Sequence, residues 1–117
     1  MKNKSVKDLA YRHTPAFILL FLSKEDLYGA ALLSLMEKEL SNCNVDSAAI
    51  YRSLQKLEKE EAVKSYWETD ISGPAKKWYK ITDIGVERLA WHKEDIEKRM
   101  ENFRSFLEMY NSNLNRD

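Results

Sequence analysis

The sequence predicts a mainly α-helical chain that carries a two-stranded β-hairpin and ends in one long helix. Three observations lead to this prediction. Apolar residues recur at helical spacing in several segments, aromatic and β-branched residues flank a Gly-Pro turn, and an apolar seam runs through the last third of the chain. With 117 residues, the chain is long enough for one domain with a projecting element and too short for two.

The charge balance limits the kinds of partner that the chain could bind, and the cysteine content indicates the compartment in which it is expected. Nineteen Lys and Arg residues balance nineteen Asp and Glu residues, so a charged partner must be met by a local patch. Cys43 is the single cysteine and can form neither an internal disulfide nor a thiolate metal site. The apolar run over residues 16–22 is far shorter than the roughly 20 residues that span a bilayer. We therefore expect a soluble cytoplasmic protein without a metal, a cofactor or a membrane segment.

The first predicted helix is buried on all sides. Thr14 is suited to cap it, and Pro15 to occupy its first turn, where the missing N–H costs nothing. The apolar run that follows would also fit a buried strand, but the Thr-Pro start favours a helix. Residues 1–13 are basic and are expected to form a separate N-terminal arm or helix.

Two amphipathic helices are predicted next. Asp26 is the candidate N-cap of the second helix, which ends near Ser41 and has an apolar stripe formed by Leu32, Leu33, Met36 and Leu40. After a polar turn, Asp46 caps a third helix. The buried side of the third helix consists of Ile50, Leu54 and Leu57.

A hairpin follows the third helix. Residues 62–68 and 77–81 are the two predicted strands, and residues 69–74 form a long tip between them. Three helices followed by a hairpin are the layout of a winged helix-turn-helix, whose third helix enters the DNA major groove. We assign residues 14–82 to this DNA-binding domain.

Thr82 caps the last predicted helix, which runs from Asp83 to near Leu114 and is on the order of 48 Å long. The positions that recur along this helix at alternating steps of three and four residues form one seam, and every position in it except Lys93 is apolar. Such a seam needs a partner helix, most simply from a second copy of the chain. We therefore assign residues 83–117 to dimerisation; the alternative is a helix that folds back over its own domain. The predicted dimer contacts are Leu89, Ile96, Met100, Phe103, Leu107 and Tyr110.

The candidate DNA contacts lie on the third helix and the hairpin. Residues 1–24 and 62–82 are net basic, although the chain as a whole is neutral. Hydroxyl, amide, guanidinium and small apolar groups read base edges, and lysines hold phosphates. The predicted major-groove residues are Ser47, Ala48, Tyr51, Arg52 and Gln55. The predicted phosphate contacts are Lys76 and Lys77.

Several stretches of the chain resemble the PadR family of transcriptional regulators. They are Leu27-Tyr28-Gly29, the third helix over residues 49–58, Ser65-Tyr66-Trp67-Glu68, and residues 73–85 through the hairpin. The short length with one terminal helix resembles the smaller PadR subfamily. That resemblance implies a homodimeric repressor released by a small aromatic or phenolic ligand. Two positions depart from the family pattern: Glu61 replaces the usual Gly after the third helix, and Lys76 stands where Arg is usual.

The resemblance implies a ligand site between the dimerisation helices and the DNA-binding domains. Aromatic and Met side chains make adaptable apolar sites. The candidate lining residues are Trp91, Ile96, Met100 and Phe103, with Trp67 and Trp78 nearer the hairpin. Plain core or dimer packing is the alternative for each of them, and Trp91 could instead fasten the last helix to its own domain.

Catalytic motifs are not recognised in the sequence. His13 and His92 lack a nucleophile-like neighbour and a metal-ligand spacing, so we interpret both as solvated or capping residues. An enzyme is therefore not expected. The predicted function is a homodimeric regulator that binds a pseudo-palindromic double-stranded DNA operator. The alternative is a dimeric winged-helix module that binds a protein and not DNA.

Overall fold

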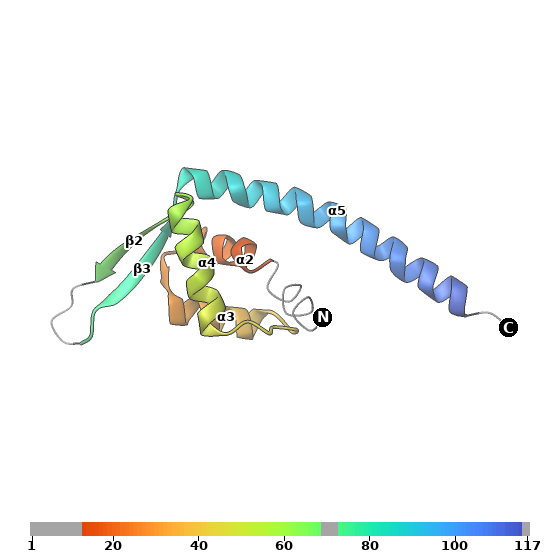
Figure 1. Ribbon diagram of the computed structural model, residues 1–117, viewed down its shortest axis with the longest axis horizontal. Helices are drawn as coiled ribbons and strands as arrows, with labels where there is room; N and C mark the ends of the chain where they lie inside the picture. Colours follow the sequence, from red (N-terminus) through yellow and green to blue (C-terminus); the bar gives the residue numbers. More distant parts are fainter. Residues whose placement is uncertain (1–12, 69–72, 116–117) are drawn as a thin grey trace.

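The computed structural model describes residues 13–68 and 73–115. It is mainly helical, with α2, α3 and α4 packed together, a hairpin projecting on one side and α5 on the other (Figure 1). Of the predicted arm over residues 1–13, residues 1–12 lie outside the described residues, as do residues 69–72 of the predicted tip. The elements in chain order are α2 (Thr14–Leu22), β1 (Leu27–Tyr28), α3 (Gly29–Glu39), α4 (Ser47–Lys59), β2 (Val63–Glu68), β3 (Lys76–Ile81) and α5 (Asp83–Leu114).

Helix α2 lies at the centre of the core, and its buried residues include Ile18, Leu19 and Leu22. The prediction that it is helical is confirmed, but the cap position was wrong by one residue. His13 occupies the N-cap, and Thr14 is the first helical residue. The Thr14 hydroxyl oxygen is buried and has no hydrogen-bond partner, whereas a cap would have accepted one from the backbone.

The start of α3 differs from the sequence prediction. Tyr28, not Asp26, occupies the N-cap, and α3 ends at Glu39, slightly earlier than predicted. Asp26 instead accepts a hydrogen bond from the Tyr66 hydroxyl, 2.6 Å long, across 40 residues of sequence. The cap prediction failed because residues 27–28 form strand β1, which delays the helix.

Helix α4 begins and ends with specific backbone bonds. Asp46 caps its start by accepting a bond from the Ala49 N–H at 2.9 Å, as predicted. At its end, the N–H of Ala62 donates to the carbonyl of Leu57, and that of Glu61 donates to the carbonyl of Glu58. These two bonds form a Schellman motif, which requires a left-handed residue. Glu61 adopts this conformation with φ 64°.

The hairpin is confirmed, and a short third strand joins it. Strands β2 and β3 pair antiparallel with Ser65 opposite Tyr79, and β1 adds to the free edge of β3. Strand β1 was missed because it has only two residues, too few to show an alternating pattern. Tyr79 and Val63 close the core against the helices. We call the β2–β3 hairpin the wing.

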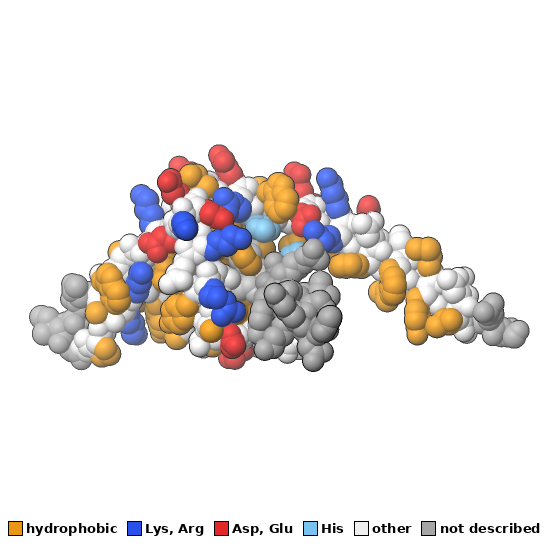
Figure 2. Space-filling view, in the orientation of Figure 1, with side chains coloured by type: hydrophobic (Ala, Val, Ile, Leu, Met, Phe, Trp, Pro, Cys, Tyr) orange, Lys and Arg blue, Asp and Glu red, His pale blue; other side chains and the backbone are white. Residues whose placement is uncertain are grey.

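Helix α5 begins at the Thr82 cap, as predicted, and its outer half leaves the body of the protein (Figure 1). Leu89 packs against the core, but residues 100–115 are all exposed. Hydrophobic side chains gather along one edge of this outer half (Figure 2). Nothing in residues 13–68 and 73–115 covers them, so the outer half of the helix does not fold back over its own domain. No helix in this part of the chain is long and apolar enough to cross a membrane.

Candidate nucleic-acid interface

The two faces of α4 differ sharply. Ile50, Leu54 and Leu57 are buried in the core. The five predicted major-groove residues are all exposed on the other face: Ser47, Ala48, Tyr51, Arg52 and Gln55. Small, hydroxyl, amide and guanidinium groups therefore stand together on one accessible helical surface, where they can reach base edges.

Tyr51 is positioned by the first residue of α3. A Cβ atom at Gly29, the first residue of α3, would lie 2.5 Å from Cε1 of the Tyr51 ring. Such an approach is possible only because glycine has no side chain. The ring is still 47% exposed, so α3 orients Tyr51 without burying it.

The two wing lysines lie on opposite faces of the wing. Lys76 pairs with Glu68 in register, and its ammonium lies 4.5 Å from the centre of the Tyr28 ring. Lys77 pairs with Trp67, and its ammonium lies 5.9 Å from the centre of the indole. Because side chains alternate along a strand, the two ammonium groups cannot face one DNA strand together.

Hydrogen bonds hold the face of the wing that carries Lys76. The Tyr66 hydroxyl donates to Asp26, and this bond raises the pKa of Tyr66. The Trp78 indole donates to Glu68 at 3.1 Å and meets the Tyr28 ring edge-on, with centroids 5.0 Å apart. The aromatic rings on this face are therefore already in contact with other residues of the same chain.

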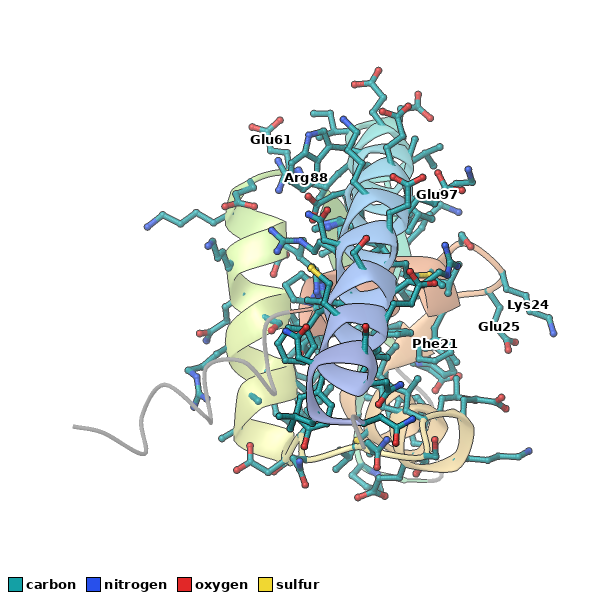
Figure 3. All side chains as sticks on the ribbon, turned by 90° about the vertical axis from the view of Figure 1, so that its right-hand side faces the viewer. Phe21, Lys24, Glu25, Glu61, Arg88 and Glu97 are labelled. Atoms are coloured by element: carbon teal, nitrogen blue, oxygen red, sulfur yellow. The ribbon has the colours of Figure 1, made fainter. Side chains whose placement is uncertain are left out.

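A cluster of contacts joins the end of α4 to the start of α5. Arg88 of α5 forms an ion pair with Glu60, and Figure 3 shows Arg88 on the side of α5 that is turned toward the end of α4. Gly85 lies so close to the turn that follows α4 that a Cβ atom there would stand 2.2 Å from the Ala62 carbonyl oxygen. We call these contacts, with the hydrogen bond from the Thr82 hydroxyl to the Glu61 carbonyl, the α4–α5 joint. It fixes the direction in which α5 leaves the domain.

Comparison with known proteins identifies the family. The sequence profile of the Transcriptional regulator PadR-like family matches residues 18–91, more than half of the chain. The chain belongs to the PadR-like family of transcriptional regulators. The resemblance found in the sequence is thus confirmed. Members of this family are transcription regulators, which also confirms the expectation that the chain is not an enzyme.

Relatives of this PadR-like chain cover most of its length. An uncharacterized protein from Lysinibacillus sphaericus is 28% identical over 102 residues, which span 80% of this chain and 94% of that protein. A PadR family transcriptional regulator from Eggerthella lenta shares the fold, with a TM-score of 0.76, 22% identity and 91% coverage of both chains. Bacillus subtilis PadR, solved in complex with operator DNA, is 29% identical with a TM-score of 0.62, over 68% of this chain and 45% of that one.

Of the four predicted ligand-lining residues, Ile96 alone lines the hollow between α2 and α5. This hollow has a volume of about 540 Å³, and its lining includes Phe17, Leu20, Leu89 and Ile96. Met100 and Phe103 are exposed beyond it on α5. Trp91 is 60% exposed, so it neither lines the hollow nor fastens α5 to the domain.

His92, not Trp91, is the residue of that turn that faces α2. It is half-buried and lines the hollow. Its pKa is lowered, chiefly by burial and further by the nearby His13 and Arg88. The prediction that both histidines are merely solvated or capping residues therefore does not describe His92. The residues that the structure describes contain no cluster of side chains that could hold a metal ion.

Proposed function

We propose that this PadR-like chain is a homodimeric, sequence-specific DNA-binding repressor that a small aromatic ligand releases from its operator. The exposed face of α4 carries this proposal, because its polar side chains serve no role in the core of the domain. The relative from Bacillus subtilis was solved with operator DNA, which supports DNA binding by this chain. Helix α4 is the proposed recognition helix.

The chemistry of the recognition helix suits the major groove. The Arg52 guanidinium can donate two hydrogen bonds to guanine, and the Gln55 amide can bond adenine in the same bidentate way. Ala48 is small enough to contact a thymine methyl group. Ser47 and Tyr51 supply hydroxyls for bases or phosphates. All of these side chains are exposed on one face, so the domain can present them together.

The outer half of α5 supports the dimer. Its apolar side chains, among them Phe103, Leu107 and Tyr110, are more than half exposed, which is costly for a monomer. A second α5 related by a two-fold axis would cover this seam and place apolar side chains near the hollow beside α2. Two recognition helices would then read half-sites about 34 Å apart, which predicts a pseudo-palindromic operator.

Two features support release by a ligand: the hollow between α2 and α5, and the α4–α5 joint. The hollow has the volume and apolar lining that suit a small aromatic molecule. Because Arg88 pairs with Glu60, a shift of α5 against α2 would also move the end of the recognition helix. A changed spacing between the two recognition helices would weaken operator binding. The repressor role itself is what the resemblance to small PadR proteins implies.

Fluorescence anisotropy tests the proposal. The purified protein is titrated onto labelled DNA from upstream of its own gene and onto a scrambled duplex of equal composition, at several salt concentrations. Tight binding to the first duplex that weakens steeply with salt is expected, because bound phosphates release counterions. Equal weak binding to both duplexes, or none, across genomic fragments would instead favour the protein-binding module.

A further inference from the structure

We infer that a cavity beside the turn between α3 and α4 is a covalent site for small α,β-unsaturated carbonyl compounds. Cys43 is its nucleophile, and Thr14 is its hydrogen-bond donor to the carbonyl oxygen. The cavity, which we call the turn pocket, has a volume of about 360 Å³, within the range of small-molecule sites. It lies where the start of α2, the end of α3 and residues 40–45 of the turn meet. Neither the site nor its chemistry requires DNA binding.

The turn pocket is separate from the hollow between α2 and α5. Among the residues that the structure describes, Phe17 alone lines both cavities. The apolar wall of the turn pocket includes Phe17, Met36 and Leu40, and its polar groups include Thr14 and Cys43. An apolar wall together with polar groups that fix the orientation of a ligand is typical of a site for a small organic molecule.

Thr14 gives the turn pocket an unused hydrogen-bonding group. The residue is 2% exposed, and its hydroxyl oxygen has no hydrogen-bond partner. A buried hydroxyl without a partner costs free energy, which a ligand oxygen in the pocket would recover. Thr14 is the first residue of α2, and threonine in a helix divides between two χ1 rotamers. Rotation about χ1 can therefore present the hydroxyl to a ligand.

Cys43 supplies the nucleophile of the site. Its thiol is free and half-buried, and it lines the pocket from the turn that leads to the Asp46 cap of α4. Cysteine reacts as the thiolate, the form that attacks electron-poor carbon. His13 and Glu39 also line the pocket, but the described residues contain no cluster with Cys43 that could hold a metal ion. The chemistry of the pocket is therefore that of a single thiol beside a hydrogen-bond donor.

An α,β-unsaturated carbonyl compound uses both groups. A bond forms between Cys43 Sγ and the β-carbon, the carbon–carbon double bond opens, and its electron pair moves to the carbonyl oxygen as an enolate. The Thr14 hydroxyl donates to that oxygen, and the α-carbon then takes a proton from water. The net reaction adds the thiol S–H across the double bond, with no oxidant, reductant or leaving group. A disulfide would not use Thr14 in this way, because sulfur is a weak acceptor.

The rate of reaction with cyclohexenone, followed by intact-protein mass spectrometry, tests the site. Wild type should gain one adduct, and Cys43→Ser should gain none. Thr14→Val should react about tenfold more slowly, since it loses the hydrogen bond to the enolate oxygen. Valine has the shape of threonine and replaces a hydroxyl without a partner, so the variant should fold as wild type does. Thr14→Ser keeps the hydroxyl and should react at close to the wild-type rate.

A reagent without a carbonyl group separates the hydroxyl from the shape of the pocket. Dithiodipyridine reports access to the Cys43 thiol by disulfide exchange, and Thr14→Val should leave the rate of that exchange unchanged. Equal rates of wild type and Thr14→Val with cyclohexenone would overturn the assignment of Thr14 as donor. So would an equal loss with both reagents, because the threonine would then affect only access to the thiol. Absence of an adduct on wild-type Cys43 would overturn the site as a whole. None of these readouts involves DNA, so each is independent of the proposed function.

Discussion

The hydroxyl of Thr82 donates a hydrogen bond, 2.6 Å long, to the main-chain carbonyl of Glu61. The same oxygen accepts a bond from the N–H of Gly85 at 3.1 Å and so caps α5. One side chain therefore joins the left-handed residue that ends the recognition helix to the first turn of the helix proposed to dimerise. With the Arg88–Glu60 ion pair, it makes the α4–α5 joint a short mechanical path between the two functions.

Thr82→Val keeps the shape of the side chain and removes both hydrogen bonds. We expect the free energy of unfolding to fall by about 1–2 kcal/mol, the usual cost of losing a cap and a side-chain bond to the backbone. Urea unfolding at one fixed protein concentration measures it, because a dimer's stability depends on concentration. Thr82→Ser retains the hydroxyl and should lie close to wild type. Equal stability of the valine variant would contradict the role given to this joint.

Glu61→Gly should stabilise the protein. Glu61 has φ 64°, a conformation that costs a residue with a Cβ atom about 1–2 kcal/mol and costs glycine little. Part of this gain is lost because glycine is more flexible in the unfolded chain, so we expect about 0.5–1 kcal/mol. Glu61→Ala removes the same charge without freeing the backbone. The difference between the two variants in thermal or urea unfolding isolates the backbone effect, and no difference would argue against it.

Arg52→Ala should weaken operator binding by at least about 30-fold, because the variant dimer loses two bidentate base contacts, one in each half-site, at about 1–3 kcal/mol each. Lys59→Ala is the matched control: it removes one positive charge from the other end of the same helix, where the side chain is also exposed. Anisotropy gives both affinities, and size-exclusion chromatography verifies that the oligomeric state is unchanged. Equal losses in the two variants would show that Arg52 acts only through net charge.

Gly29→Ala should act on DNA binding through Tyr51. The added methyl group would stand 2.5 Å from the Tyr51 ring, which must then leave its place against α3. We expect operator affinity to fall about as much as in Tyr51→Ala. The double variant should lose little more, because both changes remove the same oriented ring. Additive losses in this double-mutant cycle would show that Gly29 and Tyr51 act independently.

Leu107→Glu should break the proposed dimer. Leu107 is 58% exposed in the isolated chain, and each buried leucine contributes about 1.5–3 kcal/mol, twice over in a symmetric pair. The dimer dissociation constant should therefore rise by at least about 100-fold in analytical ultracentrifugation. Ser105→Glu adds the same charge two residues away, on another side of the helix, and should leave the dimer intact. Persistence of the dimer in the leucine variant would contradict the predicted seam.

Local signals in the sequence were sufficient for most of the helical framework. Asp46 and Thr82 cap their helices as predicted, because a cap bonds an N–H three residues away and needs no distant partner. The apolar stripe of α4 and the extent of α5 are likewise periodic features of adjacent residues. Asp26 failed as a cap because residues 27–28 form strand β1, whose partner strand β3 is distant in sequence, and no local pattern shows that pairing.

The sequence by itself determined which side chains α4 offers, since a face opposite Ile50, Leu54 and Leu57 follows from helical spacing alone. It also determined that α5 carries an unpaired apolar seam. Only the tertiary structure decided on which face of the wing each lysine lies. The strand register places Lys76 over Tyr28 and Lys77 beside Trp67. Likewise, only packing exposed Trp91 and turned His92 toward α2. Register and helix rotation are set by contacts between segments distant in sequence, which is why spacing alone could not give them.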